Sequence, residues 1–231
     1  MCSNYQPVTR MDRLLTFFGV ERAKDEPTKD VFPLGMAPFI RLTTEGTEGG
    51  QPALLVDDGM FGLLPNFATE LAYGRRTYNA RSETVAKLPS FRHAWANSQR
   101  CIIPAESFYE PSYETGKAVR WRISQPGDVP VGIAGIYRRW KNPAGGELLT
   151  FTMLTVNADG HPIMKRFHKP GDEKRMVVIV DPKDYMTWLT CPIEEAPSFF
   201  KQWMGPLDTV AAPLARAPKI KARPPATDEL F

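Results

Sequence analysis

Proline and glycine occur so densely along this chain that they limit its fold more than any other sequence feature. The 231 residues include 22 prolines and 17 glycines, and the regular segments between them are mostly short. Proline cannot donate a backbone hydrogen bond and glycine favours turns, so both interrupt helices and strands. With 42% hydrophobic residues the chain can still bury one substantial core. We therefore predict a single globular domain built from short elements.

Hydrophobic periodicity predicts more strands than helices. Helices are expected at residues 10–18, 89–97, 181–189 and 193–203. Strands are expected on both sides of a Gly-rich turn within residues 41–59, as two short pieces of 101–111 interrupted at 104–107, and at 118–124, 131–140, 148–156 and 175–180. Strands and helices do not alternate as they do in a Rossmann sheet, so the predicted fold class is a mixed, mostly antiparallel α+β domain.

The last part of the chain differs from the rest. From Gly205 onward it carries five prolines and shows no sustained hydrophobic period. We expect residues 1–210 to form the catalytic domain and residues 211–231 to form an extended, Pro-rich tail.

Cysteine usage indicates a cytoplasmic protein. Cys2, Cys101 and Cys191 form neither a Cys-x-x-Cys pair nor an even disulfide set, and a membrane span is not expected. The three cysteines and three histidines lack the spacing of a metal site, so no metal is predicted. The net charge of +3 is too small to indicate nucleic-acid binding by itself.

The N-terminal sequence MCSNY puts a cysteine directly after the initiator methionine. Removal of Met1 would give Cys2 both a free α-amine, with a pKa of about 7.7 to 8.0, and a thiol, with a pKa of about 8.5. An amine that attacks an aldehyde forms an imine, and the neighbouring thiol can close a five-membered thiazolidine on it. On position alone, an ordinary residue in a frayed terminus is the other interpretation.

Three further stretches make the chain resemble a known family when they are read together with Cys2. They are RRTYNARSET at 75–84, SFYEP at 107–111 and HPIMKRFHKPGDEKRM at 161–176. The chain resembles the SRAP family, the SOS response-associated peptidases, whose members process abasic sites in DNA. The resemblance implies a twisted, partly barrel-like antiparallel sheet with peripheral helices and a positively charged cleft for single-stranded DNA.

The resemblance also implies roles for individual residues. Cys2 would be the covalent nucleophile, Asn79 and Glu110 would complete the pocket, and a histidine ahead of the Arg-Met pair would handle protons. The insertion KPGDEK separates His168 from Arg175, which leaves His168 or His161 for this role. We prefer His168, because a loop at KPGDEK keeps it next to the following strand. Glu106 is the alternative to Glu110.

DNA contact is predicted from two local clusters of basic residues and from an aromatic loop. Family members commonly open MCGR, whereas Ser3 and Asn4 stand here, and FGLLPNF at 61–67 replaces a Trp-rich loop. Arginine holds phosphate oxygens without reading sequence, and exposed aromatic rings stack on bases. The expected DNA contacts are Arg75, Arg76, Arg81, Lys165, Arg166, Arg175, Phe61 and Phe67.

The prediction is a monomeric protein that forms a covalent crosslink through Cys2 with abasic single-stranded DNA and needs no cofactor. Lyase activity and removal of its own Met1 are further expectations, as is association with the nucleoid after DNA damage. Two alternatives stay open. One is an N-terminal cysteine hydrolase, such as a peptidase or an amidotransferase, and the other is a binding module for single strands without enzymatic activity.

Overall fold

The computed structural model describes residues 2–43 and 50–214. Its strands are β1 (Asn4–Pro7), β2 (Met36–Thr43), β3 (Ala53–Phe61), β4 (Asn79–Arg81), β5 (Arg100–Ser112), β6 (Val119–Ser124), β7 (Val131–Lys141), β8 (Glu147–Asn157), β9 (Arg175–Val177), β10 (Ile179–Val180) and β11 (Asp208–Ala211). Its α-helices are α1 (Met11–Phe18), α2 (Arg92–Ala96) and α3 (Tyr185–Thr190). Its 3-10 helices are η2 (Leu71–Arg76), η3 (Pro126–Asp128), η4 (Met164–Arg166), η5 (Pro182–Asp184) and η6 (Ala196–Phe199).

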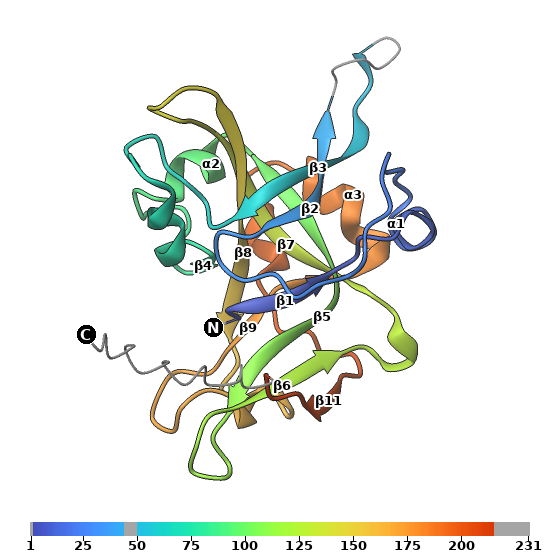
Figure 1. Cartoon of the computed structure of the whole chain (residues 1–231), viewed down its shortest axis with the longest axis vertical. Helices are drawn as coiled ribbons and strands as arrows, with labels where there is room; N and C mark the ends of the chain where they lie inside the picture. The colour runs from blue at the N-terminus through green and yellow to red at the C-terminus, as the bar shows by residue number, and fades with distance from the viewer. Residues whose placement is uncertain (1, 44–49, 215–231) are drawn as a thin grey trace, which may run out of the picture.

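Five of these strands close into a barrel. Strands β7, β8, β3 and β2 pair in this order, and β5 closes the ring because it pairs with both β2 and β7. Within the described ranges β8 pairs in parallel with β3 and β4, and the other strand pairs are antiparallel. Figure 1 shows the barrel strands in the centre and upper part of the view, with the helices around them. The predicted fold class, a mostly antiparallel and partly barrel-like sheet with peripheral helices, is confirmed.

Strand β5 is one continuous strand, where the sequence predicted two pieces. Pro104 lies opposite Gly132 of β7, and its carbonyl oxygen accepts a hydrogen bond from the backbone nitrogen of Val8 at 2.9 Å. The register with β1 shifts beside it, so that one extra residue of β5, Glu106, forms a bulge. Proline has no N–H to donate to the neighbouring strand, and a β-bulge lets the strand continue in spite of this. As a result β5 continues from the barrel to Glu110 (Figure 1).

Helix α1 lies where the sequence predicted it, whereas two other predicted helices are shorter. Helix α1 ends at Gly19, whose left-handed φ of 66° lets its N–H cap the carbonyls of Leu14 and Leu15. The helix expected at 89–97 is the single short turn of α2, and the one expected at 193–203 is reduced to η6. The helices of the described chain are all too short or too polar to cross a membrane.

Candidate active site

Cys2 lies two residues before β1, beside the far end of β5. The register pairs Asn4 with Tyr109 and Tyr5 with Phe108, which puts Cys2 close to Glu110. Its side chain is fully buried, and its Sγ donates to the carbonyl oxygen of Asn4 at 3.3 Å. Cys2 therefore lies in the folded core, just ahead of β1 (Figure 1), and not in a frayed terminus.

Asn79 reaches Cys2 from the other side of the site. It opens β4, a three-residue strand that runs parallel to β8. Its Nδ2 donates to the backbone carbonyl oxygen of Cys2 at 2.7 Å, while its Oδ1 is buried and has no hydrogen-bond partner in the described residues. A buried acceptor without a donor costs free energy, so Oδ1 suits a donor that a substrate brings.

Glu110 and His168 form the third part of the site. Nε2 of His168 lies 3.0 Å from Oε2 of Glu110, and both side chains are almost fully buried. The backbone N–H of His168 donates to the carbonyl oxygen of Pro111 at 2.7 Å. The histidine is thus attached to the same stretch of β5 that carries the carboxyl group.

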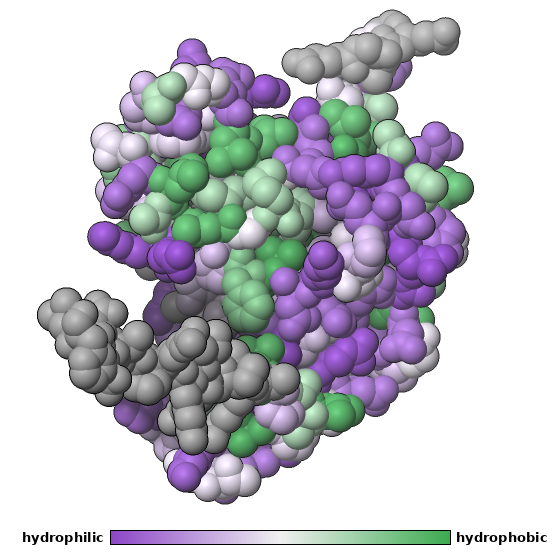
Figure 2. Space-filling model, viewed as in Figure 1, coloured by the Kyte–Doolittle hydropathy of each residue, from purple (hydrophilic) through white to green (hydrophobic). Residues whose placement is uncertain are grey.

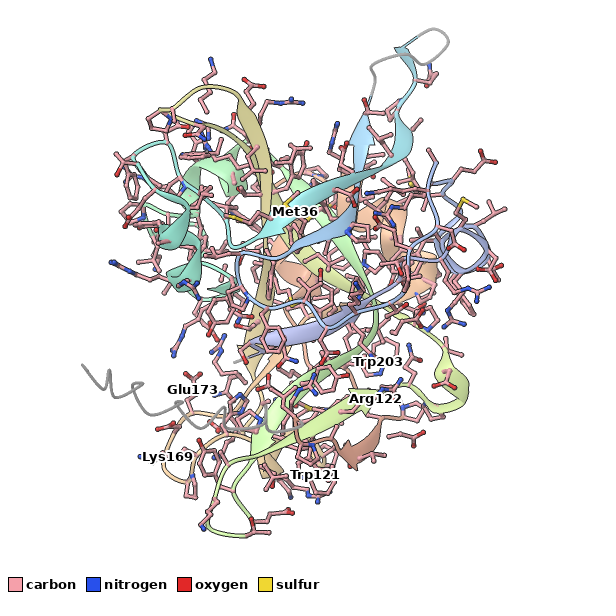
Figure 3. All side chains as sticks on the ribbon, viewed as in Figure 1. Met36, Trp121, Arg122, Lys169, Glu173 and Trp203 are labelled. Carbon is pink, nitrogen blue, oxygen red and sulfur yellow. The ribbon has the colours of Figure 1, made fainter. Side chains whose placement is uncertain are left out.

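His168 has an unusual backbone conformation. Its φ of 67° lies in the left-handed region, which is uncommon for a residue with a side chain. The insertion that follows folds back on itself, since Nζ of Lys174 donates to the carbonyl oxygens of His168 and Lys169 at 3.4 and 2.8 Å. Figure 3 shows Lys169 and Glu173 in this loop at one side of the molecule. The loop formed by the insertion therefore keeps His168 next to Glu110, and β9 begins directly after the loop at Arg175.

The thiol of Cys2 is protonated in the folded protein. Burial, and secondly the carboxyl group of Glu110, raise the pKa of this thiol from 9.0 to about 12. A thiol in this state is a weak nucleophile, so a reaction that starts at Cys2 starts more easily at the α-amine than at sulfur.

A cavity of about 260 Å³ opens beside Glu110. Its lining includes Ser3, Tyr109 and Arg120 as well as Glu110. Arg120 lies over the Tyr109 ring, 3.3 Å from the centroid, and forms an ion pair with Asp30. This cavity lies next to Glu110, whose side chain is closed off from solvent, and is large enough for a sugar-sized group.

Tyr78 is a site residue that the sequence reasoning missed. It is half-buried and makes an edge contact with Phe61, with ring centroids 5.7 Å apart. Burial raises the pKa of its hydroxyl group, and the nearby Cys2 and Glu110 raise it further. Its position directly before Asn79 was the signal that could have identified it.

The other candidate proton handlers have structural partners. The backbone nitrogens of Ile163 and Met164 donate to Nδ1 of His161, whose Nε2 donates to the carbonyl oxygen of Trp203 at 2.7 Å. Both carboxyl oxygens of Glu106 are held by Arg13, at 2.7 and 2.6 Å. His161 and Glu106 are therefore engaged by these partners and not by Cys2.

The predicted DNA contacts differ in how exposed they are. Arg75, Arg76 and Lys165 are exposed and form no ion pair within the described ranges. Arg81 and Arg166 are exposed but paired, at 2.8 Å with Glu173 and at 2.9 Å with Glu114. Arg175 is 1% exposed and pairs with Glu83 and Glu173. A buried, paired guanidinium cannot meet a phosphate, so we remove Arg175 from the expected contacts.

The two aromatic candidates also differ. Phe61 is fully buried against Tyr5, Tyr78 and Phe151, whereas Phe67 is 56% exposed. We therefore restrict the stacking proposal to Phe67. Figure 2 shows an apolar area on the upper half of the face that is in view. Met36, which Figure 3 labels, lies in this area.

The described residues contain no group of three or more His, Cys, Asp or Glu side chains that could hold a metal ion.

Comparison with known proteins agrees with this architecture. The chain is 29% identical over 210 residues to the abasic site processing protein YoqW of Bacillus subtilis (strain 168), which covers 90% of this chain and 88% of the relative. It is 28% identical over 123 residues to the abasic site processing protein HMCES of Gallus gallus, over 44% of this chain and 37% of the relative. A solved structure of a Bordetella bronchiseptica protein has a TM-score of 0.81 at 37% identity, over 92% of this chain and 100% of that chain. The family model described as SOS response associated peptidase (SRAP) matches residues 1–216, and the chain therefore belongs to this family.

Proposed function

We propose that this protein processes abasic sites in single-stranded DNA by forming a covalent bond between Cys2 and the opened sugar. The observation that carries the proposal is the meeting of four side chains from distant parts of the sequence. Asn79 bonds the Cys2 carbonyl at 2.7 Å, and His168 lies 3.0 Å from Glu110 beside the same strand end. The names of the relatives, abasic site processing proteins, support the choice of substrate.

An abasic sugar is mostly a closed hemiacetal and must open before an amine can attack it. Opening removes the proton of the C1′ hydroxyl group and delivers a proton to the ring oxygen. One group of the Glu110 and His168 pair accepts the first proton and the other donates the second. The free Oδ1 of Asn79 accepts a hydrogen bond from a hydroxyl group of the opened sugar.

The amine of Cys2 attacks first in this mechanism. It requires that Met1 has been removed, because an acylated nitrogen is not nucleophilic. Attack on the C1′ aldehyde forms a carbon–nitrogen bond, and loss of water gives an imine. The thiol, whose pKa of about 12 keeps it protonated, then adds across the imine. Sulfur bonds to C1′ and the proton goes to nitrogen, which closes the thiazolidine.

A lyase reaction is the second outcome of the same imine. Abstraction of a proton from C2′ breaks the bond between C3′ and the phosphate oxygen, and the strand is cut. The exposed cations Arg75, Arg76 and Lys165 are suited to hold the strand by its phosphates, and Phe67 is suited to stack on a base. No cofactor takes part in these steps.

A hydrolase that attacks amides through the Cys2 thiolate is favoured less, because the raised pKa of the thiol opposes a thiolate nucleophile. The experiment that tests the proposal is denaturing gel electrophoresis after incubation with an abasic single-stranded oligonucleotide. We expect a protein–DNA band that survives denaturant and is absent with the intact oligonucleotide. Mass measurement of the same protein should show that Met1 is missing. Active protein with a blocked N-terminus would refute the mechanism.

A further inference from the structure

A second site is suggested by Arg138, a buried arginine on β7. Only 7% of the residue is exposed. Its Nη1 donates to Nδ1 of His93 at 2.7 Å, and its Nη2 donates to Oδ1 of Asn66. Its Nε has no hydrogen-bond partner in the described residues. A guanidinium has five N–H groups, so most of its donor capacity is left over after these two contacts.

The charge of Arg138 has no counter-ion among the described residues. Burial is the cause that lowers its pKa, and no carboxyl group acts against it. The other buried arginines are compensated. Arg22, Arg41 and Arg175 pair with carboxyl groups, and Arg100 donates to the carbonyl oxygens of Trp188 and Cys191. A buried charge without a partner is costly, and an anion would remove this cost.

Space for an anion exists beside this arginine. A cavity of about 410 Å³ is lined by Asn66, Arg138, Arg139, Trp140 and Lys141. Arg139 is paired with Glu147 at 3.3 Å, and Lys141 is exposed. Figure 1 shows this end of the β7–β8 hairpin beside α2, at the upper left of the barrel. The lining contains three cationic side chains and no acidic one.

We propose that this cavity binds a phosphate group, and that in the working protein the phosphate belongs to a nucleic-acid strand. The N–H groups of Arg138 donate to the phosphate oxygens and the charge of Lys141 adds to the attraction. The neighbour of Asn66 in the chain is Phe67, whose ring is 56% exposed. A base stacked on Phe67 leaves a phosphate of the same strand within reach of Asn66 and Arg138. The strand form of this inference, in which the phosphate belongs to a nucleic-acid strand, rests on the proposed function.

A purely structural role for Arg138 predicts different results. In that case its contacts to His93 and Asn66 would only tie α2 and the loop 61–67 to β7. Substitution would then lower stability without changing any response to phosphate. The measurements below therefore follow the response to phosphate and not stability alone.

The first measurement is the Tm of the DNA-free full chain as chloride is replaced by inorganic phosphate at constant ionic strength. Phosphate salts stabilise proteins generally, so the expected signal is a saturable increase beyond this general effect. Arg138→Gln should lose the saturable part and Arg138→Lys should keep some of it. Arg41→Gln is the matched control, because it removes a buried guanidinium that has a carboxyl partner at 2.6 Å. It should lower the Tm and retain the saturable increase.

The second measurement separates the two sources of phosphate. Binding of an intact single-stranded oligonucleotide is followed over a range of salt concentrations. For Arg138→Gln the slope of log K against log salt should be smaller by about 0.7, the value for one lost phosphate contact on a single strand. An unchanged slope together with a lost phosphate response would overturn the strand form and leave a site for free phosphate.

The proposal as a whole fails if wild-type protein shows no saturable phosphate response, or if Arg138→Gln retains it. Neither result depends on an abasic site, so these outcomes are distinguishable from failure of the Cys2 chemistry.

Discussion

Nε2 of His168 lies 3.0 Å from Oε2 of Glu110, and the two residues come from segments separated by the whole β6–β7–β8 part of the sheet. A histidine and a carboxyl group at this distance can share and exchange a proton. Both are almost fully buried beside Cys2, so a substrate that enters is exposed to them and not to bulk water. The first two predictions test this pair.

Glu110→Gln should slow formation of the covalent adduct with abasic single-stranded DNA. The amide keeps the shape of the carboxyl group but cannot exchange protons, and positioned acid and base groups contribute about 100- to 10,000-fold. Single-turnover gels at saturating DNA measure the rate. Binding to an intact strand is the control and should stay nearly unchanged. A loss of less than about tenfold in rate would assign Glu110 a structural role.

His168→Ala should slow formation or reversal of the adduct, while His161→Ala should mainly lower stability. His161 is bonded on both ring nitrogens to backbone groups, so its loss leaves buried donors and an acceptor unsatisfied. Adduct kinetics and urea unfolding of both variants check this. If His161→Ala slowed the adduct more than His168→Ala did, the proton handler would be His161.

The fold class could be predicted from the sequence because the alternating hydrophobic pattern of β6 and the apolar runs of β7 and β8 are local signals. The barrel was predicted only through the family resemblance and not from local pattern, because its closure depends on β5 pairing with two different strands. The break that the sequence predicted at Pro104 was wrong, because the bulge at Glu106 lets the strand continue. Local sequence does not contain a partner strand, and the partner decides whether a proline ends the strand.

The site was predictable in its members but not in its geometry. The NARSET and SFYEP motifs identified Asn79 and Glu110, yet nothing in them indicates that Asn79 bonds the Cys2 carbonyl. The basic clusters were counted from sequence as free charges. Folding pairs Arg81 with Glu173 and Arg166 with Glu114, acids that a count along the chain cannot assign. Phe61 was likewise buried by packing that is long-range in sequence.

Cys2→Ser should still form an imine but no stable ring. The α-amine is retained, whereas the hydroxyl group is a weaker nucleophile than a thiol toward the imine carbon. Borohydride reduction followed by a denaturing gel should show the trapped imine for both proteins. Without reductant only wild type should give the band. Equal bands from the two proteins without reductant would contradict a thiazolidine product.

The protonated thiol of Cys2 should make stability depend on pH in the alkaline range. Its pKa is about 12 in the native state, raised from 9.0, so its contribution to stability is present below pH 9 and is lost as the pH rises toward 12. In that interval the unfolded thiol ionises while the native one stays protonated, which favours the unfolded state. Above pH 9 wild type should lose about 1.4 kcal/mol per pH unit more than Cys2→Ala does.

Urea unfolding of the two proteins at a series of pH values measures this difference. Cys101, whose pKa burial also raises, is present in both proteins and cancels in the comparison. Parallel curves above pH 9 would show that the thiol is not buried in its protonated form, and the argument that the amine attacks first would lose its basis.

Arg81→Ala should weaken DNA binding, whereas Arg175→Ala should lower stability. Arg81 is exposed, so a phosphate can compete with Glu173 for its guanidinium, and its loss should weaken binding to unrelated single strands. The slope of log K against log salt should fall by about 0.7 for one lost phosphate contact. Fluorescence anisotropy at several salt concentrations measures both quantities. Loss of the adduct with binding intact at saturating DNA would instead assign Arg81 to the chemistry.

Arg175 provides the contrast because it is 1% exposed and bridges Glu83 and Glu173. Arg175→Ala should lower the free energy of unfolding, because it leaves the buried carbonyl oxygen of Thr155 without its donor, and a buried polar group without its partner costs about 1–3 kcal/mol. At a temperature where the variant is folded, its salt slope should equal that of wild type. A smaller slope would mean that Arg175 meets a phosphate after all, which would require the loop before β9 to open when DNA binds.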